Sequence, residues 1–248
     1  MMFENYERTA GYSLQLRRVL AVMLLLLAVC SFAAAEDVPP PVLLTPLTGE
    51  FFKPDFAADK SWPDYRPDGT HYGYEQDHWD GCSVWCAVSG CEKTAESSGC
   101  LVAQGAYSYE ADHLIDSSRN TAWAEGVPGH GFGESTTLTR TIVLSNEENM
   151  LTYTGLCIVN GYARTEEAWR NNGRVKRLIV YKDDQYLCDL LLKNTMKPQY
   201  FDLSELKLDA ASGETVCFRF VIADVWPGDR YSDTALTGIE FAFSTPNH

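Results

Sequence analysis

Several motifs that mark common enzyme classes are missing from this 248-residue sequence. It has no G-x-S-x-G nucleophile elbow, no H-E-x-x-H zinc motif and no glycine-rich loop that would hold a phosphate. Histidine is scarce at five residues, and only His113 and His130 lie in the motif-rich centre. The sequence therefore offers little to nucleophilic or metal-dependent catalysis, and we expect that the protein is not an enzyme.

Basic residues are also few, with 20 Lys and Arg against 34 Asp and Glu. A surface this acidic repels nucleic acid and anionic lipid, so we expect no nucleic-acid partner and favour a neutral or cationic one. Acidity also keeps an exported protein soluble, and this simpler explanation has at least equal weight.

Long apolar runs are absent apart from Val19–Val29, which follows Arg17 and Arg18 and precedes three alanines that end at Ala35. This pattern predicts a secretory signal over residues 1–35 and a secreted or periplasmic protein. An uncleaved anchor is the alternative, although the run is short for a bilayer. No membrane insertion of the mature chain is expected.

Regular periodicity is lacking in residues 36–80, which hold seven of the eleven prolines, ten acidic residues and three basic ones. This composition predicts an extended acidic, proline-rich arm or linker.

Seven cysteines follow residue 35, and four of them lie within nineteen residues. In an exported chain, Cys82, Cys86, Cys91 and Cys100 indicate a small disulfide staple whose pairing stays open. The odd total leaves at least one cysteine unpaired. Three more cysteines lie in strand-like runs as candidate buried thiols: Cys157, Cys188 and Cys217.

Helical periodicity is almost absent after Cys100, where strand signals come at short intervals. The predicted strands are 136–144, 153–160, 175–182, 185–192, 199–203, 215–223 and 239–244. Asp183 and Asp184 predict a tight hairpin turn, and helical turns are expected only over 111–115 and 166–170. The expected fold is all-β, an antiparallel β-sandwich of the jelly-roll type over residues 81–248 with a Cys-rich entry segment.

The centre of the chain, Ile115–Glu134, holds an acidic turn, Trp123 and a glycine loop. Four glycines in eight residues mean that the shape of this loop is specified. We expect Trp123 to fill the core. Glu125 and Glu134, at the two ends of the loop, are candidates either to accept hydrogen bonds from loop amides or to act as the acid and base of a glycosidase.

Several blocks of this sequence resemble a known family. LIDSSRNTAW resembles the entry motif of discoidin-like domains, the galactose-binding-like jelly rolls related to the coagulation-factor C domains. TAWAEGVPGHGFGE, NGYARTEEAWRNNGRVKRLIVY, ADVWPGDRYSDTALTGIEF and the earlier CSVWC resemble the glycan-binding type first associated with the translocation segment of a secreted bacterial NAD glycohydrolase. The resemblance covers about residues 80–247 and implies a non-catalytic carbohydrate-binding module.

The resemblance also implies a structural calcium ion, with Asp116 and Thr121 as ligands. Gly238 stands where such domains carry a glutamate, and Glu240, two residues later, is the candidate substitute. Calcium prefers six to eight oxygen ligands, so a lost carboxylate weakens the expected site.

A glycan site needs an aromatic ring for the apolar face of a sugar and planar or charged groups for its hydroxyls. Loop residues of these types are the predicted contacts: Trp169, Asn172, Arg174, Trp226, Arg230, Tyr231, Asp233, Glu125 and Glu134. Loop tryptophans also serve simply to pin loops. The alternatives are a protein-interaction or translocation module that binds a protein partner and, less favoured, a glycoside hydrolase.

Overall fold

Alternation of buried and exposed side chains defines the strands of the computed structural model, which describes residues 40–47, 93–144 and 150–244. In β10 (Thr215–Trp226), Val216, Phe218, Phe220 and Ile222 are all buried, and the residues between them are partly exposed. A strand that buries every second side chain covers one side of a hydrophobic core. The structure is therefore all-β, as the sequence predicted.

The other elements are short or follow directly from the predicted strands. They are β1 (Leu43–Leu44), β2 (Lys93–Ser97), η2 (Ala111–Leu114), β3 (Trp123–Ala124), β4 (Ser135–Thr141), β5 (Met150–Asn160), α2 (Glu166–Asn171), β6 (Gly173–Lys182), β7 (Gln185–Leu191), β8 (Gln199–Asp202), η3 (Ser204–Leu206), β9 (Leu208–Ala211) and β11 (Thr234–Ser244). None of the helices in the described ranges is long and apolar enough to cross a membrane.

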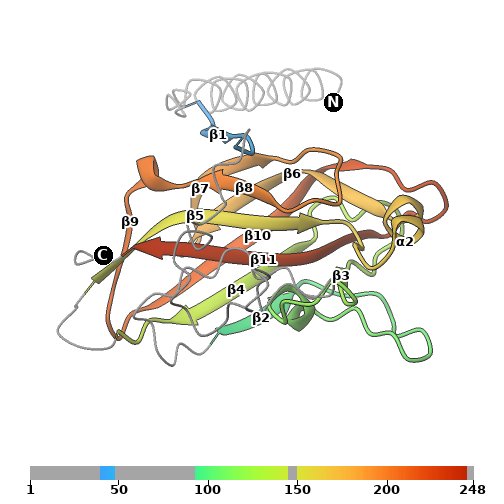
Figure 1. The fold of residues 1–248 in the computed structure, drawn as a ribbon, viewed down its shortest axis with the longest axis horizontal. Coiled ribbons are helices and arrows are strands. Elements are labelled where there is room, and N and C mark those ends of the chain that lie inside the picture. The colour runs from blue at the N-terminus through green and yellow to red at the C-terminus, as the bar shows by residue number, and fades with distance from the viewer. Residues whose placement is uncertain (1–39, 48–92, 145–149, 245–248) are drawn as a thin grey trace, which may run out of the picture. The chain divides into compact units, whose positions relative to one another are not determined.

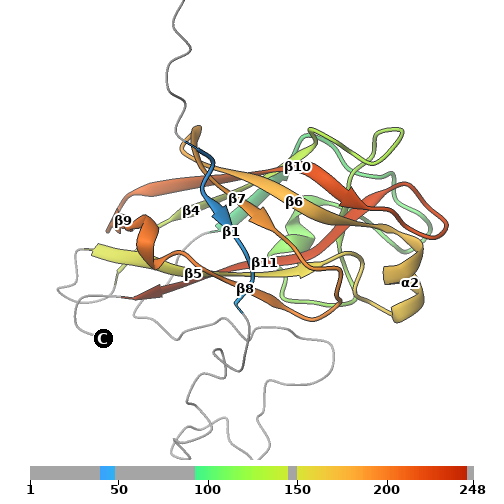
Figure 2. The same ribbon diagram turned by 90° about the horizontal axis from the view of Figure 1, so that it is seen from above.

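The strands form two layers, which are joined where β6 and β11 pair over a short stretch. Along the hydrogen-bonded path the order is β2-β4-β10-β6-β11-β5-β8, and β7 pairs with the free side of β6. β6 meets β11 only at Gly173 and Arg174, in parallel, and then continues between β10 and β7. Figure 2 shows β4, β10, β6 and β7 on one side and β5, β11 and β8 on the other. The result is a β-sandwich of the discoidin-like type.

The core lies between the two layers and is built on aromatic rings. Phe218 of β10 lies 4.5 Å, between ring centroids, from Phe241 of β11 and 5.1 Å from Tyr153 of β5. Trp123 is also buried, as predicted, and its indole N–H donates to the carbonyl of Gly99 at 3.0 Å. Aromatic pairs such as Phe218 and Phe241 stabilise the fold by more than the burial of their apolar surface alone.

The predicted hairpin is present between β6 and β7. Asp183 and Asp184 both adopt positive φ values, 48° and 62°, which is the conformation that a two-residue turn of type I′ requires. Aspartate tolerates this region better than most residues, which explains why the pair is found here.

Part of the predicted arm joins the sandwich. Leu43 and Leu44 form β1, which pairs in parallel with β7. The backbone N–H of Leu47 donates to the carbonyl of Tyr200 in β8 at 2.8 Å. This short segment therefore contacts an edge strand of each layer.

Several predictions lie outside the described residues: the signal at 1–35, most of the arm, and Cys82, Cys86 and Cys91. The described cysteines all carry free thiols, with Cys100 exposed, Cys157 and Cys188 buried, and Cys217 partly exposed. Burial raises the pKa of Cys188 to about 12, so this thiol is inert.

Candidate functional site

A cavity of about 450 Å³ opens where the loops at one end of the sandwich meet. Figure 1 shows α2, β3 and the connection between β10 and β11 at this end, and Figure 2 shows α2 beside that connection. Its lining combines four tyrosines (Tyr107, Tyr109, Tyr162, Tyr231), five polar or charged residues (Gln104, Arg164, Asn171, Asn172, Asp233) and three alanines (Ala124, Ala168, Ala235), with Leu101 and Thr165. We call it the tyrosine cavity. Its volume lies within the range of small-molecule sites.

Two of its walls are fastened to each other by aromatic contacts. The rings of Tyr109 and Tyr162 meet nearly at right angles, with centroids 6.2 Å apart. The guanidinium of Arg164 lies 4.5 Å from the centre of the Tyr107 ring. Hydrogen bonds to Tyr162 and Tyr107 raise the pKa of Arg164, so this side chain is a permanent cation held against the wall.

A third wall is the loop between β10 and β11, which rests on the end of α2. The backbone N–H groups of Asp229 and Tyr231 donate to the carbonyls of Arg170 and Asn171, at 2.9 and 2.8 Å. Gly228 allows this close approach, because a Cβ there would lie 2.4 Å from the Asn171 oxygen. Backbone contacts therefore hold Tyr231 in place.

The phenol of Tyr109 has a raised pKa. Burial is the main cause, and nearby Tyr162, Asp233, Tyr107 and Tyr231 add to it. These electrostatic effects on Tyr109 indicate that the three other phenols and the Asp233 carboxylate lie close to it. At neutral pH Tyr109 is an uncharged hydrogen-bonding group with an apolar ring.

Of the predicted contact residues, three line the tyrosine cavity: Asn172, Tyr231 and Asp233. Trp169 and Arg174 do not line it. Their side chains stack on each other, with the guanidinium 4.7 Å from the indole ring, and the Trp169 N–H donates to the Asn160 carbonyl. Arg174 is buried and donates to the carbonyls of Arg170 and Asn172 at the end of α2.

Trp226 and Arg230 are also placed away from the cavity lining. The ammonium of Lys176 lies 5.0 Å from the Trp226 ring on the outer face of β10 and β6. The Arg230 guanidinium lies 5.2 Å from the Tyr231 ring, so Arg230 supports a cavity residue from outside.

Glu125 and Glu134 both hold the glycine loop. The carboxylate of Glu125 is fully buried and accepts hydrogen bonds from the backbone N–H groups of Thr234 (3.0 Å) and Val127 (2.9 Å). Glu134 accepts one from the Ser98 hydroxyl at 2.6 Å. Neither residue lines the tyrosine cavity.

The acidic turn is closed by side-chain hydrogen bonds around Asp116. Its carboxylate accepts from the Thr121 hydroxyl at 2.6 Å and from the Ser118 N–H at 2.9 Å. His113 bridges Asp116 (3.1 Å) and the Ser108 hydroxyl (2.8 Å). Hydrogen bonds thus link a serine, a histidine and an aspartate in the same succession as in a Ser-His-Asp catalytic triad. Neither Ser108 nor His113 lines the cavity, however.

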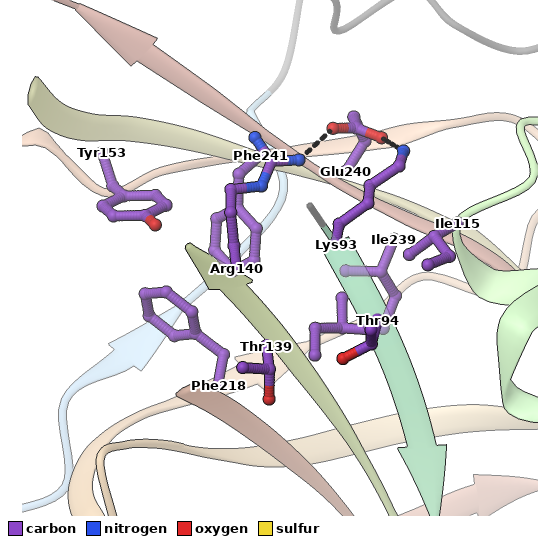
Figure 3. A pocket seen from close by; sticks show the side chains of 11 residues that line it. Lys93, Thr94, Ile115, Thr139, Arg140, Tyr153, Phe218, Ile239, Glu240 and Phe241 are labelled. Atoms are coloured by element: carbon purple, nitrogen blue, oxygen red, sulfur yellow. Dashed lines mark hydrogen bonds and ion pairs between the residues drawn. The ribbon is translucent and has the colours of Figure 1, made fainter. Parts of the chain in front are cut away.

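Glu240 lies between two cations, as Figure 3 shows. Its oxygens pair with Lys93 at 3.3 Å and with Arg140 at 3.2 Å, above a hollow of about 20 Å³ that has room for little more than one water molecule.

The residues that the resemblance assigns to calcium do not fit the ion well. Asp116 already accepts hydrogen bonds from its own turn, and Glu240 is neutralised by two cations. The described ranges contain no group of three or more His, Cys, Asp or Glu side chains arranged to hold a metal ion. Calcium binding therefore stays a prediction from the resemblance, without support from these contacts.

Sequence reasoning missed six polar or aromatic lining residues: Gln104, Tyr107, Tyr109, Tyr162, Arg164 and Thr165. The sequence carried only a weak signal, namely that Tyr107 and Tyr109 are two residues apart, as are Tyr162 and Arg164 just after the end of β5.

The two-layer antiparallel sandwich with a cavity among its end loops defines a discoidin-like, galactose-binding-like domain. The chain belongs to the family described as the NAD glycohydrolase translocation F5/8 type C domain, whose model matches residues 85–242.

Solved structures show more distant similarity. The arabinofuranosyltransferase AftD from Mycobacteria is 15% identical, with a TM-score of 0.37, over 62% of this chain and 12% of that one. The beta-galactosidase BgaA of Streptococcus pneumoniae is 9% identical, with a TM-score of 0.36, over 61% of this chain and 91% of that one. Similarity at this level says nothing about a ligand. The search of curated proteins finds no match.

Proposed function

We propose that this protein is a non-catalytic carbohydrate-binding module that takes a surface or matrix glycan into the tyrosine cavity. The observation that carries the proposal is the composition of the lining: four tyrosine rings beside two asparagines, a glutamine, an arginine and an aspartate. A saccharide presents apolar C–H faces and pairs of hydroxyls, which suit rings and planar polar groups respectively. The secretory signal expected over residues 1–35 would bring the module to such glycans.

The placement of the acidic pair supports a binding role over hydrolysis. A glycosidase needs two carboxyl groups that face the scissile bond across a cleft. Glu125 is fully buried with both oxygens engaged, and Glu134 is bonded to Ser98. The tyrosine cavity itself is lined by one carboxylate, that of Asp233.

Protein recognition is the second candidate, and the glycine loop favours it. Phe132 and Val127, two apolar residues of this loop, are 61% and 37% exposed and so available to a partner. The glycine loop also contacts the start of β11, because the Thr234 hydroxyl donates to the His130 carbonyl at 3.0 Å. A protein partner on this surface would cover part of the cavity rim.

The test compares two cavity tyrosines with a matched control on a glycan array. Tyr107, Tyr231 and Tyr186 are 45%, 43% and 44% exposed, and Tyr186 lies on β7, outside the cavity lining. We expect Tyr107→Ala and Tyr231→Ala to lose glycan binding, since each removes an aromatic ring that would pack on the apolar face of a sugar. Tyr186→Ala should bind as the wild type does.

The melting temperature (Tm) of each variant serves as the folding control. Equal binding by all three variants would overturn the site. A partner retained from extracts by the wild type, lost with Phe132→Ala and released by no saccharide would replace the proposal with protein recognition.

A further inference from the structure

One charged group in the tyrosine cavity has no partner. The carboxylate of Asp233 makes no hydrogen bond or ion pair with any residue in the described ranges, although its backbone carbonyl accepts from the Gly173 N–H at 2.8 Å. The side chain is only partly exposed and lies near the Tyr109 phenol, whose pKa it helps to raise. A partly buried charge without a partner is costly unless a ligand or water meets it.

The other charged group of the lining is already engaged. Arg164 stacks on the Tyr107 ring, and its side chain is exposed, so water meets its charge. Asp233 is only partly exposed, and its carboxylate makes no hydrogen bond or ion pair within the described residues. The charge that gains most from a ligand in this cavity is therefore negative.

Tyrosine rings around a carboxylate form a favourable environment for an ammonium group. The negative face of an aromatic ring attracts a cation, and a nearby carboxylate adds direct Coulomb attraction. Around Asp233 the chain gathers four such rings: Tyr107, Tyr109, Tyr162 and Tyr231. The sequence as a whole carries a formal charge of −14, which raises the local concentration of cations and repels acidic sugars.

We infer that the tyrosine cavity selects saccharides with a free, protonated amine, with Asp233 as the group that recognises the ammonium. This inference rests on the proposed function and specifies its ligand class: amino sugars without N-acetylation, in preference to neutral, N-acetylated or acidic sugars. Acetylation removes the charge and should remove the preference.

The experiment measures dissociation constants by calorimetry with saccharides that differ in one substituent. Chitotriose is compared with its fully N-acetylated form, and galactosamine with galactose, N-acetylgalactosamine and galacturonic acid, at mildly acidic pH where sugar amines are protonated. We expect the amine to bind about tenfold tighter than its acetylated counterpart, the effect of one charge-assisted hydrogen bond. Added salt should reduce this difference.

Two variants assign the preference to one side chain. Asp233→Asn should bind both forms equally and keep its Tm, because the carboxylate has no partner within the described structure. Asp184→Asn makes the same change of charge on a carboxylate that is 89% exposed at the β6–β7 turn, and it should keep the wild-type preference.

The outcomes separate the inference from the function on which it rests. Equal binding of amine and acetylated sugars by the wild type would overturn the inference and leave glycan binding intact. A preference that survives Asp233→Asn would overturn the role of Asp233. Binding of no saccharide at all would overturn both.

Discussion

Two acidic residues near the cavity have opposite surroundings, and the difference separates a structural role from a binding role. Glu125 is fully buried, and its two oxygens accept from the backbone N–H groups of Val127 and Thr234. It thereby ties the glycine loop to β11. Asp233 faces the cavity with its carboxylate unpaired. Exposure and partners, rather than residue type, distinguish the two.

Glu125→Gln should destabilise the protein. The amide keeps one acceptor oxygen but turns its NH₂ group toward a backbone N–H, so a buried donor loses its partner. The expected loss is about 1–3 kcal/mol in the free energy of unfolding, measured by chemical denaturation. Glu134→Gln is the matched control, because its carboxylate is partly exposed and meets a hydroxyl that can also donate to an amide oxygen.

The wild type and Glu125→Gln should also differ in how their stability depends on pH. Burial raises the pKa of Glu125 above its ordinary value of 4.5, while the hydrogen bonds from Thr234 and Val127 offset part of this rise. The folded protein therefore holds this proton more tightly than the unfolded chain does. The stability that the group contributes is present below the ordinary pKa and is lost as pH rises through the folded pKa.

The advantage of the wild type over Glu125→Gln should thus narrow as pH rises through this window. Denaturation curves at a series of pH values measure it. A constant difference across the window would contradict the raised pKa.

For individual residues, the sequence predicted the types of side chain at the binding site better than the directions in which they point. It favoured Trp169 and Trp226 because tryptophan in a polar loop suits a sugar face. Trp169 instead donates to the Asn160 carbonyl and stacks with Arg174, which depends on how α2 packs against β5 and β6. The direction of a loop side chain follows from tertiary contacts that no local pattern contains.

Among the elements, β1 comes from the predicted arm and pairs in parallel with β7. The N–H of Asp189 in β7 donates to the Val42 carbonyl at 2.8 Å, and Leu47 donates to Tyr200 in β8. Leu44 packs against the main core cluster. The segment therefore covers the edges of both layers, which would otherwise expose unpaired backbone groups.

Leu44→Ala should lower the stability of the sandwich, and Leu43→Ala should not. Leu44 is partly buried against the core, whereas Leu43 is 53% exposed on the same two-residue strand. The expected loss for Leu44→Ala is about 1–2 kcal/mol, given its partial burial. Thermal melting of the two variants measures it, and equal Tm values would show that the Leu44 side chain adds nothing to the stability of the fold.

The longer strands and the four-residue β8 were predictable, whereas β1, β2, β3 and β9 were not. The predicted ranges 175–182 and 185–192 correspond to β6 (Gly173–Lys182) and β7 (Gln185–Leu191), because alternation and a two-residue turn are local signals. β1 and β3 have two residues each, too few for alternation to show. Their place depends on partner strands far along the chain.

For the molecule as a whole, the calcium question is whether a bound ion stabilises the domain. The acidic turn is closed by hydrogen bonds between Asp116 and Thr121, and Glu240 is held by two cations. We therefore expect the Tm to be unchanged by a chelator and by added calcium. A Tm that falls with chelator and recovers with calcium would establish the ion that the resemblance implies.

The structure has the fold that the family resemblance implied, because that resemblance rests on long blocks of sequence in a fixed order. The binding surface was harder to predict, since it combines segments that the chain keeps apart. Tyr107 and Tyr231 line the same cavity and are separated by most of the sandwich in sequence.

This assembly from distant segments links recognition to folding. Residues 101–109, 162–172 and 231–235 converge only when both layers are complete. A saccharide that occupies the cavity would cross-link the first and last thirds of the sandwich without a covalent bond. Occupancy would then draw the cooperative unfolding equilibrium of the entire domain toward the native state, in proportion to the logarithm of ligand concentration once the site is saturated.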